Sequence, residues 1–341
     1  MQFQSPASLE AKIGQMLLVG FEGLTAPDYL LDWLREGRVG GVILFARNVE
    51  SPAQVAALTG AIHAAATYGA IVSIDQEGGT VARLREGFTE SPGAMALASA
   101  REGEALTEAV SAVLARELRA LGIGWDYAPV VDLTYTAANP SVGTRSFGSD
   151  ADSVARLAAA AVRGFQRGGV AACVKHFPGL GDTPIDTHMA MAVVDTPVEH
   201  LIKHDLVPYR AAIAAGVASV MITHVLYRAL DADHPATLSP VVVHRLLREA
   251  LGYDGVVTTD CLEMRAVRDH YGARESAVLA ALAGIDAILF SHTRAMQEAA
   301  YDGLLEAARS GRLGADAIDG ANRRMLALKE AYAAPPGDLG I

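Results

Sequence analysis

The pattern of hydrophobic and polar positions alternates two kinds of segment along the chain. Short apolar runs rich in Val and Ile end in a polar or Gly-rich turn, and a stretch with helical spacing follows. Several runs are apolar at nearly every position, which is typical of strands buried on both faces of a parallel sheet. The pattern predicts eight strands, at residues 15–21, 40–46, 70–76, 123–133, 169–177, 218–225, 254–260 and 285–292.

Stretches rich in Ala, Leu, Glu and Arg separate these strands and have the spacing of amphipathic helices. Several begin with Ser-Pro or with an acidic first turn, which is the expected signal for a helix N-terminus. The predicted helices cover residues 51–66, 103–121, 149–167, 198–216, 239–251 and 275–285.

Eight strands alternating with helices predict an α/β fold, a single-domain (β/α)8 TIM barrel. The main competitor is a doubly wound open sheet, which should carry a Gly-x-Gly-x-x-Gly fingerprint after its first strand. The segment after the first strand here, "GFEGLTAPDYL", lacks that pattern. Pro and Gly are spread along the chain without a linker-like cluster, so we expect one catalytic domain at residues 1–332 and a loose C-terminal tail at 333–341.

Composition narrows the functional classes. The 341 residues are 51% hydrophobic and carry a formal net charge of −11, which argues against a nucleic-acid partner because phosphate binding needs a basic face. We expect no membrane span, because no run of roughly 18 uncharged apolar residues occurs. The N-terminus lacks the features of a secretory signal, and two cysteines do not make a disulfide framework, so we predict a cytoplasmic protein.

Polar side chains gather at the predicted strand ends, where barrel enzymes hold their active sites. These residues are Asp75, Lys175 and His176, His224, Asp260, and Ser291 with His292. Each aspartate also suits a helix N-cap, and His224 also suits a hydrogen-bonded core position. Lys175 is different, because a lysine directly after the apolar run "AACV" needs a polar pocket to point into. We therefore predict a catalytic or binding site at this end of the barrel.

Four segments together carry a family resemblance. "KHFPGLGDTPIDTH", residues 175–188, resembles the K-H-F-P-G-x-G-(x)4-D-[ST]-H signature of the β-N-acetylhexosaminidases of glycoside hydrolase family 3, bacterial enzymes associated with recycling of cell-wall sugars. "IDQEGGTVARL", "NPSVGTRSFGSD" and "VVTTDCLEM" are similar to three further segments of that family, in the same order. The resemblance extends over nearly the whole chain.

The resemblance implies a role for each matching residue. Asp260 would be the nucleophile of a retaining glycosidase, and His188 would be the general acid/base with Asp186 as its partner. The residues that would hold the sugar are Asp75, Arg83, Arg145, Lys175 and His176, and we add His224 from its position at a strand end. The substrate would be a small carbohydrate with a terminal β-N-acetylglucosamine, and neither a cofactor nor a metal is implied.

Two positions depart from the family pattern. Leu180 stands between the glycines of "PGLGD", where relatives often have His, and Cys261 follows the expected nucleophile, where relatives often have a second Asp. Neither change removes a catalytic group. The chain ends soon after its eighth strand and one more helix, which favours the N-acetylhexosaminidase type over relatives with a second α/β domain.

Other functions remain open at this point. A β-glucosidase of the same family is the nearest alternative. A metal-dependent hydrolase would use His176, His188 and His224 as zinc ligands, and full activity after exhaustive chelation would exclude it. A non-catalytic sugar-binding barrel would be expected to lose Asp260 or His188, and both are present.

Overall fold

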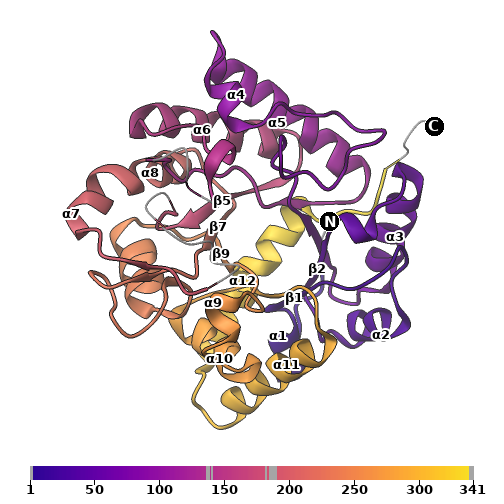
Figure 1. Cartoon of the computed structure of the whole chain (residues 1–341). Helices are drawn as coiled ribbons and strands as arrows, with labels where there is room; N and C mark the ends of the chain where they lie inside the picture. The colour runs from indigo at the N-terminus through magenta and orange to yellow at the C-terminus, as the bar shows by residue number, and fades with distance from the viewer. Residues whose placement is uncertain (1–2, 136–138, 140, 181–182, 184–189, 338–341) are drawn as a thin grey trace.

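The computed structural model describes residues 3–135, 139, 141–180, 183 and 190–337. Eight parallel strands form one sheet that curves into a barrel, with the order β10-β1-β2-β3-β4-β5-β7-β9 (Figure 1). The strands are β1 (Leu17–Val19), β2 (Gly41–Leu44), β3 (Ile71–Ile74), β4 (Trp125–Asp126), β5 (Ala171–Phe177), β7 (Ser219–Ile222), β9 (Val256–Thr259) and β10 (Ile288–Phe290). A bridge between Thr258 and Ala287 joins the two edge strands, β9 and β10. The predicted (β/α)8 barrel is confirmed.

Helices surround the barrel on the outside, as Figure 1 shows. The α-helices in the described part of the chain are α1 (Leu9–Gly14), α2 (Asp28–Glu36), α3 (Pro52–Ala65), α4 (Ala94–Ala98), α5 (Gly103–Ala120), α6 (Ala151–Arg167), α7 (Val198–His200), α8 (Leu206–Ala214), α9 (Arg265–Arg268), α10 (Ala273–Ala283), α11 (Arg294–Arg309) and α12 (Ala315–Tyr332), the last of which covers one end of the barrel. Two predicted caps are present, because the side chains of Ser51 and Asp150 accept hydrogen bonds from the first turns of α3 and α6.

Alternation along the strands produces two hydrophobic layers. Leu18, Ile43 and Trp125 point into the barrel, whereas Val42 and Val72 pack outward against the helices. The indole of Trp125 donates a hydrogen bond to Ser219 Oγ at 2.7 Å across the interior. The barrel is therefore a packed core rather than a pore, and the site must lie at one of its ends.

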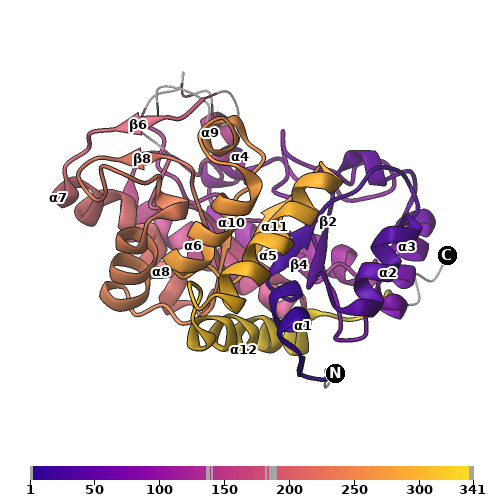
Figure 2. The ribbon, with the colours of Figure 1, turned by 90° about the horizontal axis from the view of Figure 1, so that it is seen from below.

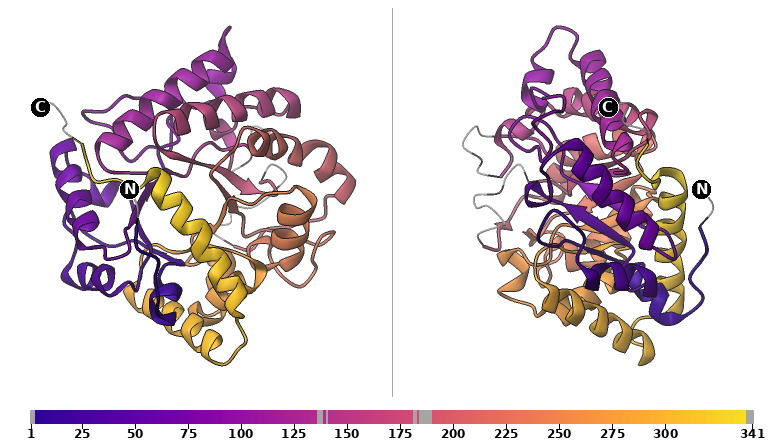
Figure 3. Two further views of the ribbon diagram at one scale, coloured as in Figure 1. Left: turned by 180° about the vertical axis from the view of Figure 1, so that it is seen from behind. Right: turned by 90° about the vertical axis from the view of Figure 1, so that its right-hand side faces the viewer.

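Helix α12 covers the N-terminal end of the barrel. Figure 2 shows it beneath the strands, on the side opposite β6 (Val193–Val194) and β8 (Leu226–Tyr227), and Figure 3 shows it crossing the barrel from behind. Lys329 of α12 is buried and donates hydrogen bonds to Gln15 Oε1 and Gly69 O. This helix closes the end of the barrel that is opposite the strand ends predicted to carry the site.

Three details differ from the sequence-based expectations. The predicted helix 198–216 is divided by a π-helical turn, η3 (Leu201–Asp205), and the predicted helix 239–251 is the π-helix η5 (Val241–Ala250). The short parallel pair β6 and β8 was not predicted. Gly337, in the segment expected to be a tail, donates a backbone hydrogen bond to Ala120 O at 3.0 Å. Within the described part of the chain, no helix is both long and apolar enough to cross a membrane.

Candidate active site

The strand ends β3 and β5 meet in a buried network of charged side chains. Lys175 Nζ lies 2.7 Å from Asp75 Oδ1 and 2.7 Å from Glu77 Oε1, and its side chain is 2% exposed. Lys175 lies near the C-terminal end of β5, and Asp75 and Glu77 follow the C-terminal end of β3. The two strand ends lie at the same mouth of the barrel, which brings the three side chains together. The predicted polar pocket for Lys175 is therefore present.

Two arginines complete this network. Arg145 makes a bidentate contact with Glu77, with Nε–Oε2 at 2.8 Å and Nη2–Oε1 at 2.7 Å. Arg83 Nη2 lies 3.2 Å from Asp75 Oδ2, and its guanidinium lies 5.5 Å from the ring centroid of Phe45. Bidentate pairs of this kind fix both partners in orientation as well as in charge.

The charges in the network determine its protonation. Burial alone would raise the pKa of Asp75, but Lys175 and Arg83 hold that pKa below its usual value. Burial is likewise outweighed at Glu77, where Lys175 and Arg145 lower the pKa to about 2. Burial opposes the charged form of Lys175, and Asp75 and Glu77 more than offset this and raise its pKa. All three groups are ionised at neutral pH, so Lys175 acts as a hydrogen-bond donor and not as a base.

A second buried carboxylate, Asp132, organises the end of β5. It accepts hydrogen bonds from the backbone N–H of His176 at 3.0 Å and of Leu180 at 2.9 Å. The ring nitrogen Nδ1 of His176 lies 2.8 Å from Asp132 Oδ2. The peptide bond between Lys175 and His176 is cis, as are those before Pro129 and Pro178. The contacts with Asp132 hold His176 at the end of β5, next to Lys175 in the chain.

Asp260 directly follows β9, as predicted for the end of the seventh barrel strand. Its Oδ1 accepts a hydrogen bond of 2.7 Å from Cys261 N. Asp75 directly follows β3, and β3 and β9 run parallel within the one barrel sheet. Asp75 and Asp260 therefore lie at the same mouth of the barrel.

The remaining predicted residues divide into two groups. His224 is fully buried, and its Nε2 lies 3.0 Å from Cys261 O, so it connects the ends of β7 and β9. Its role in sugar binding stays a prediction. Asp186 and His188 lie outside the described residues, and so does part of the segment 175–188. Among the residues that the structure describes, no group of three or more His, Cys, Asp or Glu has a geometry that could hold a metal ion.

Both departures from the family pattern are buried. Leu180 is 3% exposed and packs in the hydrophobic core, while its carbonyl accepts hydrogen bonds from Asn139 Nδ2 and Thr183 Oγ1. Burial, opposed by weaker contacts, raises the pKa of the Cys261 thiol to about 12, and its Sγ lies 3.9 Å from Glu263 Oε2. Cys261 is therefore a neutral core residue beside Asp260.

The sequence analysis did not single out Asp132 or Glu77 as site residues. Glu77 precedes Gly78 and Gly79, which turn the chain with φ of +88° and +59°, and its carboxylate pairs with Lys175 and Arg145. The signal for Asp132 was its place inside the apolar run "APVVDL", where an ionised side chain needs buried partners.

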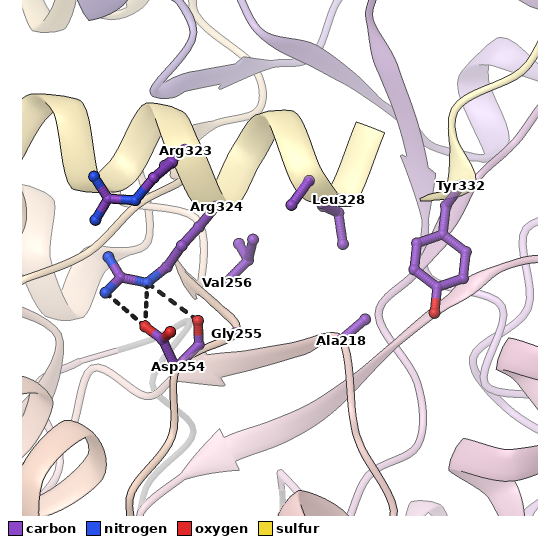
Figure 4. Close-up of a pocket in the computed structure, with 9 residues that line it drawn as sticks. Ala218, Asp254, Gly255, Val256, Arg323, Arg324, Leu328 and Tyr332 are labelled. Atoms are coloured by element: carbon purple, nitrogen blue, oxygen red, sulfur yellow. Dashed lines mark hydrogen bonds and ion pairs between the residues drawn. The ribbon is translucent and has the colours of Figure 1, made fainter. Parts of the chain in front are cut away.

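A hollow of about 400 Å³ lies at the other end of the barrel, between α12 and the first residues of β7 and β9. Figure 4 shows Arg324 bonded to Asp254 there, with Tyr332 and Leu328 on the α12 side. None of the predicted site residues lines it. The charged network at the strand ends, and not this hollow, is the candidate active site.

Comparison with known proteins agrees with this geometry. The profile described as "Glycosyl hydrolase family 3 N terminal domain" matches residues 8–328. A protein named beta-hexosaminidase from Stenotrophomonas maltophilia is 40% identical over 291 residues, which are 84% of this chain and 86% of that protein. One from Xylella fastidiosa is 39% identical over 83% of this chain and 85% of that protein.

Solved structures give the same result. A glycoside hydrolase family 3 β-N-acetylglucosaminidase from Paenibacillus superposes with a TM-score of 0.94 and 47% identity, over 98% of this chain and 65% of that one. A β-N-acetylhexosaminidase from Beutenbergia cavernae superposes with a TM-score of 0.88 and 34% identity, over 96% of this chain and 100% of that one. The chain therefore belongs to glycosyl hydrolase family 3.

Proposed function

We propose that this glycosidase removes terminal β-linked N-acetylglucosamine from small carbohydrates, with net retention of the anomeric configuration. The observation that carries the proposal is the convergence of Asp260, Asp75 and Lys175 at the C-terminal mouth of the barrel, where β9, β3 and β5 end. The relatives named beta-hexosaminidase, which match most of the chain, support the choice of sugar.

In the first step an Asp260 carboxylate oxygen attacks the anomeric carbon, and the bond from that carbon to the leaving oxygen breaks. His188 gives its proton to the leaving oxygen, and Asp186 orients the ring of His188. In the second step His188 takes a proton from water, the water oxygen attacks the anomeric carbon, and Asp260 is released as a carboxylate. Two inversions at one carbon give net retention.

The charged network is suited to binding the sugar ring. Lys175 and Arg83 are permanent donors, and the ionised Asp75 between them is an acceptor. Three cations face two carboxylates in this network, so it carries one excess positive charge.

The natural setting is also part of the proposal. We expect the substrates to be peptidoglycan fragments and the compartment to be the cytoplasm. The free, buried thiols of Cys173 and Cys261 are compatible with a reducing compartment. A β-glucosidase specificity within the same family is the alternative, because the network binds ring hydroxyls that glucose and N-acetylglucosamine share.

The test compares hydrolysis of an aryl N-acetyl-β-glucosaminide with that of an aryl β-glucoside. We expect the wild type to prefer the first substrate and Asp260→Asn to lose nearly all activity. His188→Ala should lose less activity on substrates with acidic leaving groups than on other substrates, because such leaving groups need little proton assistance. Ordinary activity of Asp260→Asn would exclude Asp260 as the nucleophile, and preference for the glucoside would select the alternative.

A further inference from the structure

We propose that Asp132 is a positioning residue that fixes the tautomer of His176, so that Nε2 of His176 accepts a hydrogen bond from a sugar hydroxyl. This inference rests on the proposed function for the identity of the ligand. It specifies the chemistry of His176, which the sequence analysis named only as one of the residues that would hold the sugar.

The contacts of Asp132 fix its own charge state. Its side chain is fully buried and accepts hydrogen bonds from two backbone N–H groups, those of His176 and Leu180. The imidazole Nδ1 of His176 at 2.8 Å and the hydroxyl of Tyr209 at 3.4 Å also lie against it. Burial and then the charge of Asp132 raise the pKa of Tyr209, which keeps that hydroxyl protonated. Backbone N–H groups only donate, so two of them bonded to the Asp132 oxygens favour the carboxylate over the carboxylic acid.

The carboxylate in turn fixes the ring of His176. A carboxylate oxygen 2.8 Å from Nδ1 accepts only, so Nδ1 carries the hydrogen, and the neutral ring then has a lone pair on Nε2. The backbone holds this arrangement rigidly, because Val131 N donates to Lys175 O at 2.9 Å and joins the Asp132 segment to β5. The ring of Tyr209 also packs edge-on against Phe177 at 5.1 Å.

An acceptor at this position complements the rest of the network. Lys175 precedes His176 in the chain and offers donors, and Asp75 is already shared between Lys175 and Arg83. A ring hydroxyl that accepts from a cation has its own hydrogen left to donate. Nε2 of His176 can accept that hydrogen, so one sugar hydroxyl would accept a hydrogen bond from a cation and donate one to His176.

The direct test is nitrogen-15 NMR of the histidine-labelled free protein at pH 7.5, with the His176 signals assigned by comparison with His176→Gln. We expect a protonated Nδ1 and an unprotonated Nε2 in the wild type. Asp132→Asn should lose this single-tautomer signature. A wild-type His176 with the hydrogen on Nε2, or on both nitrogens, would overturn the proposal whatever the enzyme hydrolyses.

Asp126→Asn is the matched control. Asp126 is also a fully buried carboxyl and belongs to β4, which precedes Asp132 in the chain. Burial raises the pKa of Asp126 to about 8, so its side chain is mostly neutral at pH 7 and the neutral amide of Asn is a close substitute. Its Oδ1 accepts from Gln76 N and makes no contact with His176. We expect the His176 signals to be unchanged in this variant, and a change equal to that of Asp132→Asn would count against a specific role for Asp132.

A kinetic cycle tests the route of the effect. Asp132→Asn should lower kcat/KM for the aryl N-acetyl-β-glucosaminide by about 100-fold, the cost of a small misplacement at a site. Because Asp132 acts through His176, introducing Asp132→Asn into the His176→Gln variant should lower kcat/KM by much less than 100-fold. Losses that multiply would show a general structural role instead. If the wild type has no hexosaminidase activity, the proposed function fails, and the NMR result still decides the tautomer.

Discussion

Removing the charge of Glu77 tests whether the buried network holds the site together. Glu77→Gln keeps the size of the side chain but leaves Arg145 without its bidentate partner and Lys175 with one carboxylate instead of two. Breaking a buried ion pair on one side is costly because a buried charge loses its compensation. We expect the variant to fold with a clearly lower free energy of unfolding.

The pKa of Glu77 gives the size of its contribution to the free energy of unfolding. It falls from the usual 4.5 to about 2 in the folded protein, and each unit corresponds to about 1.4 kcal/mol, so the folded environment favours the charged form by about 3 kcal/mol. A carboxyl whose folded pKa is lowered contributes this stability above pH 4.5, and loses it as the pH falls from 4.5 towards 2. By pH 3.5 about 1 kcal/mol of it should have disappeared.

The assay is urea denaturation of wild type and Glu77→Gln at pH 7 and at pH 3.5. The control is Glu298→Gln, which removes an exposed i,i+4 pair with Arg294 and should cost no more than about 0.5 kcal/mol. A loss for Glu77→Gln that is as small as this, or that does not shrink at the lower pH, would refute the reasoning.

Three further predictions concern buried titratable groups. Burial lowers the pKa of Lys329 to about 7, so between pH 7 and 10.5 the unfolded chain binds more protons than the folded protein. Urea titrations should therefore show the free energy of unfolding of the wild type rising relative to that of Lys329→Met over this pH range. No change with pH would contradict the neutral lysine. Burial raises the pKa of Asp126 from 3.8 to about 8, so Asp126→Asn should become more stable than wild type as pH rises from 4 to 8, and a constant difference would argue against it. Burial raises the pKa of both Cys173 and Cys261 to about 12, so neither thiol should react with a disulfide reagent at pH 8 until the protein unfolds, and rapid labelling of the folded protein would exclude this burial.

The barrel was predictable because each of its strands has a recognisable local sequence pattern. All eight central strands lie within the predicted ranges, since a strand buried on both faces reads as a continuous apolar run. The pair β6 and β8 has two residues in each strand, which is too short for any periodicity. The π-helical turn Leu201–Asp205 keeps the composition of an α-helix, so the sequence there predicts a helix but not its hydrogen-bond pattern.

The site was predictable as a set of strand ends but not as a network. Lys175 and Asp75 were found because polar residues directly after apolar strands are conspicuous. Their pairing joins residues 100 positions apart, and the contact between Asp132 and His176 joins residues 44 apart, so no local pattern encodes either. Glu77 and Asp132 acquire their roles only when the closed sheet brings β3, β4 and β5 together.

The proposed mechanism requires Asp260 to form a covalent bond to the sugar. The most direct measurement is mass spectrometry of the protein after incubation with a slow, mechanism-based N-acetylglucosaminyl fluoride, followed by peptide mapping. We expect one added sugar per chain, attached to the peptide that contains Asp260 and absent in Asp260→Asn. A sugar on another residue, or full turnover by Asp260→Asn, would contradict it.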